Sequence, residues 1–473
     1  MKGRMASKKT ERAKLVLTDW ITANISFVLF NILRCLVQPE ASHSLQYVAD
    51  YLTQPKICAE QAFIPVLLLG LYLLSGFYNR PFGKSRFGEL LNTAAVSCVS
   101  TILIHFCLLT NDQAADIEEN ILQLLMIFLI LFVGTATGRL IMINKQIRHF
   151  KKREWLYSTV VVGNSPKARR MARKLENSKS TMGHCIEGFF SIPGEHDADH
   201  EAWDLDDIEE ICRSRAVDQI VLAPEKSEED KVLELVYRLF PLGIPIKLTP
   251  ETMNFMTSSI KLRDIYGQPL VDLTHSSMGE SELNIKRAFD VTASILTLIA
   301  LSPVYLALAL WVKLDSPGPV FYRQERIGLH QKPFDIIKFR TMRTDAEAEG
   351  PQLCGDNDPR VTAAGRIMRK YRLDELPQFY NVLKGDMSIV GPRPERQFYI
   401  SRIMRKAPYY TLLYQTRPGI TSWGMVQYGY ASTVDEMVER SKFDMLYISN
   451  MSILVDLKIM LYTVLTILEG RGK

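Results

Sequence analysis

Long uncharged stretches dominate the first third of the chain, whereas the rest, with one exception, has the mixed polar and apolar pattern of soluble proteins. Each stretch is long enough to cross a hydrocarbon core of about 30 Å as a helix that rises about 1.5 Å per residue. The pattern therefore predicts transmembrane helices. The three clearest stretches are residues 61–79, 90–111 and 120–138.

A fourth candidate, roughly residues 15–36, is weaker because two charged residues interrupt it. Asp19 and Arg34 lie near its ends, where we expect their side chains to extend toward water. A signal peptide is the alternative, but no small-residue cleavage site follows and other spans come after it. We therefore predict that residues 1–150 form a four-helix transmembrane bundle.

Charge in the short loops predicts the orientation of this bundle. Basic residues concentrate before the first span, between spans two and three and after span four, whereas the other two loops contain only Lys56. Because cytoplasmic loops are the basic ones, both ends of the bundle are predicted to lie in the cytoplasm of a bacterial inner membrane. The residues are Lys2, Arg4, Lys8, Lys9 and Arg12, then Arg80, Lys84 and Arg86, then Lys145, Arg148, Lys151, Lys152 and Arg153.

The net charge is unevenly distributed, at +4 for residues 1–150, −5 for 151–280 and +6 for 281–473. A basic block attracts nucleic acid, anionic lipid or phosphate-bearing substrates. No zinc-finger spacing, RNA-binding signature or helix-turn-helix pattern accompanies it, so we expect no nucleic-acid partner. The seven cysteines include no CxxC pair, which argues against disulfides and metal ligands.

Residues 151–275 alternate β-rich and helical segments. Strands are expected at 157–162, 219–223 and 244–248, a rhythm typical of a Rossmann-like α/β domain with a parallel sheet. A dinucleotide site would need GxGxxG after the first strand, but the turn at 163–168 reads GNSPKA and lacks two of the three glycines. A structural or regulatory domain is therefore preferred over a working NAD site.

A fifth uncharged run, residues 291–312, has Ser302-Pro303 at its centre and basic residues on both sides. Proline removes a backbone donor and bends a helix. We predict a re-entrant helix over 287–313 that enters the inner leaflet and returns to the same side. The alternative, a kinked span, would place 313–473 outside the cell and would break the positive-inside pattern.

The C-terminal third contains a carboxylate pair, Asp374-Glu375, just after a group of basic residues. Pro377 suits the first turn of a helix, so we place both acids at the start of a helix that ends near Gly385. Arginines can neutralise phosphate oxygens, and a carboxylate can attack phosphorus or hold Mg²⁺. For a bare Asp-Glu pair, a solvated helix cap paired with arginines is the preferred interpretation, before any resemblance is considered.

From about Lys286 onward, the sequence resembles the bacterial sugar transferase family, the monotopic polyprenyl phosphate phosphoglycosyl transferases. The layout of four spans, a Rossmann-like domain and a transferase resembles the large members of that family. The resemblance implies a mainly α-helical catalytic domain over residues 281–473. The matching stretches are KRAFD (286–290), SP (302–303), SPGPVFYRQERIG (316–328), KFRTM (338–342), DPRVT (358–362), RLDELPQFYNVLKGDMSIVGPRP (372–394) and RPGITSWG (417–424).

The resemblance also implies roles for individual residues. Asp374 matches the nucleophile and a candidate Mg²⁺ ligand, and Glu375 matches its partner in the catalytic dyad. Ser302 and Pro303 match the break in the re-entrant helix. Further residues match substrate- or phosphate-binding positions, although structural ion pairing is nearly as probable for the last three of them. These are Lys338, Arg369 and Arg393, followed by Arg326, Arg340 and Arg417.

The implied reaction transfers a sugar-1-phosphate from a UDP-sugar, with glucose or galactose expected, to undecaprenyl phosphate in the membrane. UMP leaves, Mg²⁺ screens the phosphates, and the product starts an exopolysaccharide, capsule or O-antigen. The oligomeric state is open, and a homodimer is one possibility. Two alternatives remain at this point: a nucleotide-sugar oxidoreductase or epimerase that uses the middle domain, and a non-catalytic membrane scaffold. The C-terminal apolar run 451–468 fits core packing and membrane contact equally well.

Overall fold

The structure is a computed structural model. It describes residues 7–37, 44–106, 117–177, 183–192, 201–225, 231–248, 271–272, 277–348, 350, 352 and 358–469. The predicted end of the third span at residue 111 and the predicted end of the middle domain at residue 275 lie outside these ranges.

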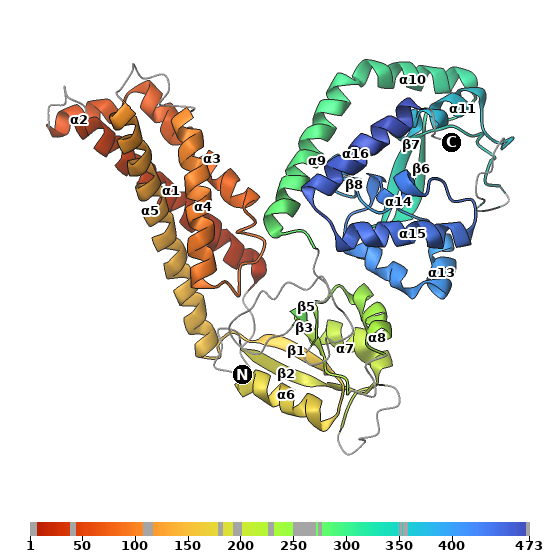
Figure 1. The fold of residues 1–473 in the computed structure, drawn as a ribbon, viewed down its shortest axis with the longest axis horizontal. Helices are drawn as coiled ribbons and strands as arrows, with labels where there is room; N and C mark the ends of the chain where they lie inside the picture. Colours follow the sequence, from red (N-terminus) through yellow and green to blue (C-terminus); the bar gives the residue numbers. More distant parts are fainter. Residues whose placement is uncertain are drawn as a thin grey trace.

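The prediction of four membrane-spanning helices is confirmed by length and composition. Four helices of the described chain are long and apolar enough to cross a membrane, namely α1, α3, α4 and α5. They pack side by side, and a short helix, α2, joins the first two (Figure 1). The bounds are α1 Lys8–Val37, α2 Leu45–Leu52, α3 Pro55–Leu74, α4 Arg86–Ile104 and α5 Ile117–Lys151.

The prediction that Asp19 and Arg34 extend toward water was wrong. Asp19 is buried inside the bundle, where it accepts hydrogen bonds from Arg139 at 2.9 Å and from the Tyr78 hydroxyl at 2.8 Å. Arg34 is also buried and lies 3.9 Å from Glu60. Charged side chains that face other helices can pair with each other inside the bundle and so do not need to reach water at the membrane surface.

The middle of the chain forms an α/β unit, as expected. Its five-stranded sheet has the order β2-β1-β3-β4-β5, with the first four strands parallel and β5 antiparallel. Helix α6 covers one face of the sheet, and α7 and α8 cover the other (Figure 1). The elements are β1 Tyr157–Val162, α6 Pro166–Asn177, β2 His184–Phe190, η2 Leu205–Asp207, α7 Ile208–Ser214, β3 Gln219–Leu222, α8 Val232–Leu239, η4 Phe240–Leu242, β4 Ile246–Leu248 and β5 Val271–Asp272, where η marks a 3₁₀ turn.

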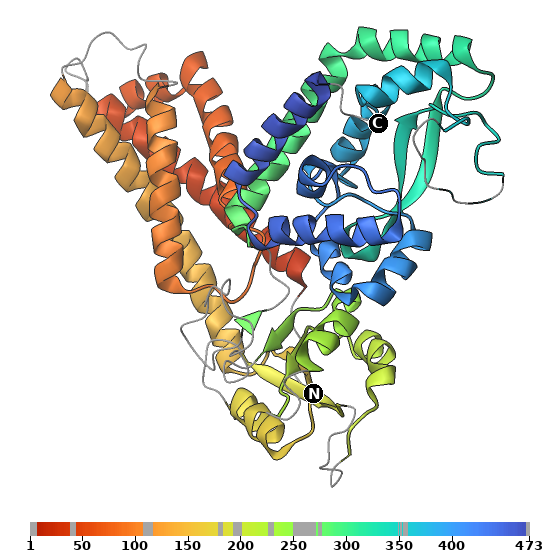
Figure 2. The same ribbon diagram turned by 45° about the vertical axis from the view of Figure 1, so that its right-hand side comes forward.

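The fifth apolar run forms two helices, α9 Glu280–Ala300 and α10 Ser302–Asp315, that meet at an angle of 64°. The break falls at Leu301, and the Ser302 hydroxyl donates to the Ile299 carbonyl at 2.8 Å, which satisfies one freed backbone group. The bent apolar pair that the sequence predicts is thus present (Figures 1 and 2).

Both arms of this pair are attached to the same C-terminal part. On α9, Arg287 donates to the Val382 carbonyl at 2.7 Å, and Asp290 accepts from the Ser388 hydroxyl at 2.7 Å. On α10, Leu308 and Val312 pack in one cluster with Phe339 and Met368. A straight span would separate the two arms by the thickness of a bilayer, so these shared contacts favour re-entry over the kinked-span alternative.

The start of α9 also docks on the transmembrane bundle. Glu280 accepts from Asn79 at 2.9 Å and from Arg80 at 2.9 Å, in the loop that follows α3. Gly76 has φ +78° and lies so close that an added Cβ would be 2.6 Å from the Cβ of Glu280. Only glycine fits both the backbone conformation and this contact.

The remaining elements form the C-terminal part, in which an antiparallel hairpin, β6–β7, and a short parallel pair, β8–β9, are surrounded by helices. The fold class predicted from the sequence is therefore confirmed. The elements are β6 Phe321–Ile327, η6 Leu329–Gln331, β7 Pro333–Phe339, α11 Ala363–Lys370, η7 Leu373–Glu375, α12 Gln378–Lys384, β8 Ser388–Val390, α13 Gln397–Lys406, η8 Pro408–Gln415, β9 Gly419–Thr421, α14 Trp423–Gln427, α15 Val434–Ser449 and α16 Ile453–Leu468.

Helix α16 has one buried face and one exposed apolar face, so core packing is confirmed and membrane contact stays a prediction. Ile459 is fully buried, and Asp456 pairs with Lys286 of α9 at 2.6 Å. Leu454 and Leu468 on the same helix are 78% and 74% exposed. The helix lies beside α9 in both views (Figures 1 and 2), so its exposed leucines extend the apolar surface of the bent pair.

Candidate active site

The carboxylate pair lies in a 3₁₀ turn, η7, between two helices. The sequence placed both acids at the start of a helix, but α12 begins only at Gln378, after Pro377. The predicted end near Gly385 is correct, since Gly385 caps α12 with φ +101°. Arg372 precedes the acids with φ +53°, a left-handed conformation that is unusual for a residue with a side chain. This conformation turns the chain so that both acids are buried.

Glu375 is held by three cationic side chains. Lys338 donates to it at 2.6 Å, Arg372 at 3.3 Å, and Arg393 lies 3.7 Å away. Burial alone would raise the pKa of Glu375, but Lys338, Arg393 and Arg372 together hold the pKa well below its ordinary value. Glu375 is therefore a fixed anion that organises the cations around it.

Asp374 differs from its neighbour because it makes no hydrogen bond or ion pair with the part of the chain that the structure describes, although it is only 7% exposed. Burial raises the pKa of Asp374 to about 6, with Lys338 opposing and Glu375 adding to the shift. A carboxylate in this state is still ionised near neutral pH, and its oxygens are not occupied by a neighbour. It is the more available of the two acids for attack or metal binding.

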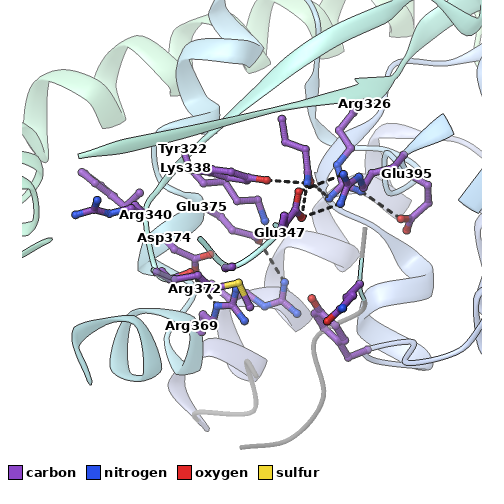
Figure 3. Close-up of a pocket in the computed structure, with 18 of the residues that line it drawn as sticks. Tyr322, Arg326, Lys338, Arg340, Glu347, Arg369, Arg372, Asp374, Glu375 and Glu395 are labelled. Carbon is purple, nitrogen blue, oxygen red and sulfur yellow. Dashed lines mark hydrogen bonds and ion pairs between the residues drawn. The ribbon is translucent and has the colours of Figure 1, made fainter. Parts of the chain in front are cut away.

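Both acids line a cavity of about 340 Å³. Figure 3 shows Asp374 and Glu375 on one side of the cavity and Arg326 and Glu395 on the other. The cavity has nine cationic side chains against four carboxylates, so it favours an anionic ligand with several charged oxygens. The cations are Arg326, Lys338, Arg340, Arg343, Arg369, Arg372, Arg393, Arg396 and Arg440.

The structure brings five of the six predicted substrate- or phosphate-binding residues to this cavity, and most of them already have partners. Arg369 donates to the Thr341 hydroxyl at 2.9 Å. Arg326 donates to Glu395 at 3.3 Å. These bonds fix the guanidinium groups at the cavity wall, where their positive charge faces a ligand.

Arg340 and Arg417 have structural contacts. Arg340 is buried and donates to the carbonyls of Ser316 and Pro317, both at 2.6 Å, over Gly318, which has φ +127°. Arg417 donates to the Gly385 carbonyl at 2.9 Å and does not line the cavity. Of the six predicted substrate- or phosphate-binding residues, Arg417 is the one that does not line the cavity.

Ser302 and Pro303 are also outside the cavity, at the bend of the apolar pair. One turn later, the Tyr305 hydroxyl donates to the Leu376 carbonyl at 2.8 Å, directly after the two acids. The bend is thereby linked to the carboxylate turn, and Phe321 and Pro319 line the cavity close to the end of α10.

Comparison with known proteins decides the family. The sequence model of the bacterial sugar transferase family matches residues 281–470. The exopolysaccharide production protein PSS of Rhizobium leguminosarum bv. phaseoli is 40% identical over 199 residues, which are 41% of this chain and 98% of that protein. The chain belongs to the bacterial sugar transferase family.

Two further relatives have named activities. The UDP-N-acetylgalactosamine-undecaprenyl-phosphate N-acetylgalactosaminephosphotransferase of Aeromonas hydrophila is 39% identical over 229 residues, 48% of this chain and 53% of that protein. The UDP-glucose:undecaprenyl-phosphate glucose-1-phosphate transferase of Escherichia coli K12 is 32% identical over 308 residues, 64% of this chain and 66% of that protein. The match thus spans between about half and two thirds of the length of these two relatives.

Sequence reasoning missed several cations of the cavity. Arg372 contacts Glu375 directly, and Arg396 pairs with Glu347 across the cavity at 2.8 Å. Arg440 lies on α15 and pairs with Glu395 at 2.5 Å. Arg372 and Arg396 stand inside or beside a matching motif, so motif position could have found them, whereas Arg440 lies in no quoted stretch.

Of the described carboxylates beside the catalytic turn, Asp374 is the one that could ligate a metal ion. Among the described residues, no group of three or more His, Cys, Asp or Glu side chains could hold a metal. Glu375 is already paired with cations, whereas Asp374 is not. This donor set fits Mg²⁺ only in the form in which substrate phosphates and water complete its coordination.

Proposed function

We propose that this sugar transferase moves a sugar-1-phosphate from a UDP-sugar to undecaprenyl phosphate and releases UMP, with Asp374 as the nucleophile. The observation that carries the proposal is a buried carboxylate without a hydrogen-bond partner among the described residues, in a cavity rich in arginine. Family membership and the names of the relatives favour this class over an oxidoreductase or a scaffold.

The first half-reaction is attack by an Asp374 oxygen on the β-phosphorus of the donor. The bond from that phosphorus to the bridging oxygen breaks, UMP leaves, and the sugar phosphate remains on Asp374 as an acyl phosphate. Lys338, Arg369 and Arg393 stabilise the charge on the phosphate oxygens, and Glu375 holds Lys338 and Arg393 in position.

In the second half-reaction, an oxygen of undecaprenyl phosphate attacks the same phosphorus and regenerates the Asp374 carboxylate. The apolar surface of α9, α10 and α16 would keep the lipid acceptor within reach, since Tyr305 ties α10 to the turn that carries the acids. Asp374, together with substrate phosphates, would hold Mg²⁺, which would add screening of the phosphate charge. The positive-inside pattern supports a cytoplasmic face for this site.

The donor sugar is proposed to be one that the relatives use, with glucose or galactose expected and N-acetylgalactosamine suggested by one relative's name. Specificity of this kind can depend on a single hydroxyl group. The lipid-linked product would initiate an exopolysaccharide, capsule or O-antigen.

The test uses the full chain in detergent with a panel of UDP-sugars. Without acceptor, the donor should release about one equivalent of UMP per enzyme and should leave a sugar phosphate on Asp374, which mass spectrometry of the peptide detects. Addition of undecaprenyl phosphate should then move that group to the lipid. Turnover with no enzyme-bound sugar phosphate and no UMP burst would contradict the covalent route.

A further inference from the structure

The α/β unit and the catalytic part share an extended apolar interface. Helix α8 and the following turn η4 contact η8, and η4 also contacts η6, the turn of the β6–β7 hairpin. Val236 and Phe240 on one side and Leu413 on the other belong to one continuous cluster of buried residues. Both views show α8 next to the catalytic part (Figures 1 and 2). A large apolar contact of this kind restricts relative motion of the two units.

Turn η8 lies directly behind one wall of the cavity. It contacts α13 and α15, and α15 carries Arg440. Arg440 and Arg326 both donate to Glu395, at 2.5 Å and 3.3 Å, and these three residues, which we call the Glu395 wall, line the cavity. Burial raises the pKa of Tyr414 in η8, and the Glu395 carboxylate raises it further, in keeping with the contacts of η8 with α13 and α15.

A second connection reaches the same wall through the hairpin. In η6, Gln331 donates to the Thr411 hydroxyl of η8 at 3.0 Å. At the end of β6, the Ile327 amide donates to the Glu395 carbonyl at 3.2 Å, one residue beyond Arg326. Arg326 and Glu395 are therefore held by the β6–β7 hairpin, and the α/β unit contacts the turn η6 of that hairpin.

The Glu395 wall has the chemistry of a binding surface and not of the reacting centre. It lies across the cavity from the two acids (Figure 3) and contributes two arginines against one carboxylate. Tyr399 and Tyr430 line the same cavity, and aromatic rings of this kind can stack on a base. The wall thus suits the nucleoside and phosphate end of a nucleotide.

We propose that the α/β unit is a positioning element for the donor nucleotide. Leu242 of η4 packs against the buried cluster, and Tyr237 is half-buried on α8, the helix that contacts η8; together they hold the Glu395 wall in the arrangement that binds the donor. The inference rests on the proposed function, because it assigns the wall to the UDP end of the donor. In this proposal the α/β unit affects the affinity for the donor and does not itself bind a dinucleotide.

The experiment compares Tyr237→Ala and Leu242→Asp in the full chain with a matched control, Leu233→Asp. Leu233 is on the same helix but is 46% exposed. Hydrogen exchange of the peptide covering 408–415 reports on η8, and steady-state kinetics report KM for the UDP-sugar and kcat. The interface variants should exchange faster and raise KM about fivefold to tenfold with kcat within about twofold, since only uniform binding is lost. The control should change neither quantity.

Faster exchange in η8 with an unchanged donor KM would overturn the inference, and so would a fall in kcat alone. Unaltered exchange in both interface variants would show that α8 and η4 do not hold η8, which overturns it as well. Tyr237→Ala is the milder change and is informative if Leu242→Asp does not fold. If the unaltered chain transfers no sugar phosphate, the proposed function fails. UDP binding, measured by thermal shift in the same variants, then decides whether the α/β unit positions a nucleotide site.

Discussion

The helix bundle and the catalytic cavity both contain buried charges, and they differ in how fully those charges are paired. In the helix bundle, Arg139 donates to Asp19 and to Glu89, each at 2.9 Å, and Lys84 lies 3.8 Å from Glu89. Two cations and two carboxylates neutralise one another there. In the catalytic cavity, cations far outnumber carboxylates, and Asp374 has no partner among the described residues.

The difference separates a structural role of buried charge from a functional one. A closed set of ion pairs fixes how helices pack, and removal of one member leaves the others uncompensated. A surplus of one sign inside a cavity is costly for the folded protein unless a ligand of the opposite sign supplies the balance. Incomplete pairing, more than burial itself, therefore favours the cavity as the proposed substrate site.

The largest expected effect is on the nucleophile. Asp374→Asn removes the attacking anion and should reduce transfer by about 10³-fold or more, because no other described acid is positioned to replace it. The melting temperature should not fall, since Asp374 makes no hydrogen bond with the described residues that would be lost. Asp386→Asn, the same change after α12 and outside the cavity, is the control and should retain normal transfer. Substantial transfer by purified Asp374→Asn protein would refute the nucleophile assignment.

The paired charges of the bundle should respond in stability and not in chemistry. Arg139→Met leaves Asp19 and Glu89 buried without their cation and is expected to cost about 3–5 kcal/mol of folding free energy. Thermal unfolding in detergent measures the loss, and Arg86→Met, at the exposed start of α4, is the matched control. Unchanged stability would mean that the bundle does not depend on this group of charges.

The pH dependence of the reaction follows from the raised pKa of Asp374, about 6. The carboxylate attacks only when ionised, so kcat/KM for the donor should fall about tenfold per pH unit below that value and level off above it. Asp345→Asn, which changes an exposed acid, should leave this fall of kcat/KM at low pH unchanged. A limb near the ordinary pKa of aspartate would show that burial does not perturb Asp374.

The smallest effect is expected at Arg417. Since Arg417 donates to the Gly385 carbonyl and lies outside the cavity, Arg417→Gln should change the donor KM by no more than about twofold. Arg393→Gln, at a position 3.7 Å from Glu375, should raise KM more strongly. Equal effects of the two variants would place Arg417 in the binding site after all.

Local patterns were sufficient to predict most of the architecture. Uncharged runs of spanning length located the four long helices, and alternating strand and helix signals located β1, β3 and β4. The Ser302-Pro303 dipeptide located the break in the apolar pair. Each of these features depends on residues that are close in the chain, so a single sequence contains the information.

Ion pairs between residues far apart in the chain could not be predicted from the sequence. Asp19 meets Arg139 across 120 residues, and Arg440 meets Glu395 across 45, so neither partner could be inferred from spacing. The sequence also did not predict that the acids lie in a 3₁₀ turn. That turn depends on the left-handed conformation of Arg372, which packing imposes, and there is no glycine at this position to indicate it. The contact of α8 with η8 could not be predicted either, because it joins two units whose helices and strands are each indicated by local sequence patterns.

The close fit between Gly76 and Glu280 has a consequence for the order of assembly. A ribosome releases the bundle and its loop well before the start of α9, and N-terminal units generally fold first. Asn79 and Arg80 can therefore be in position before Glu280 is synthesised. The helix bundle would then provide a preformed binding site for the start of α9 and so position the rest of the chain. Biogenesis, as much as activity, would then constrain that glycine.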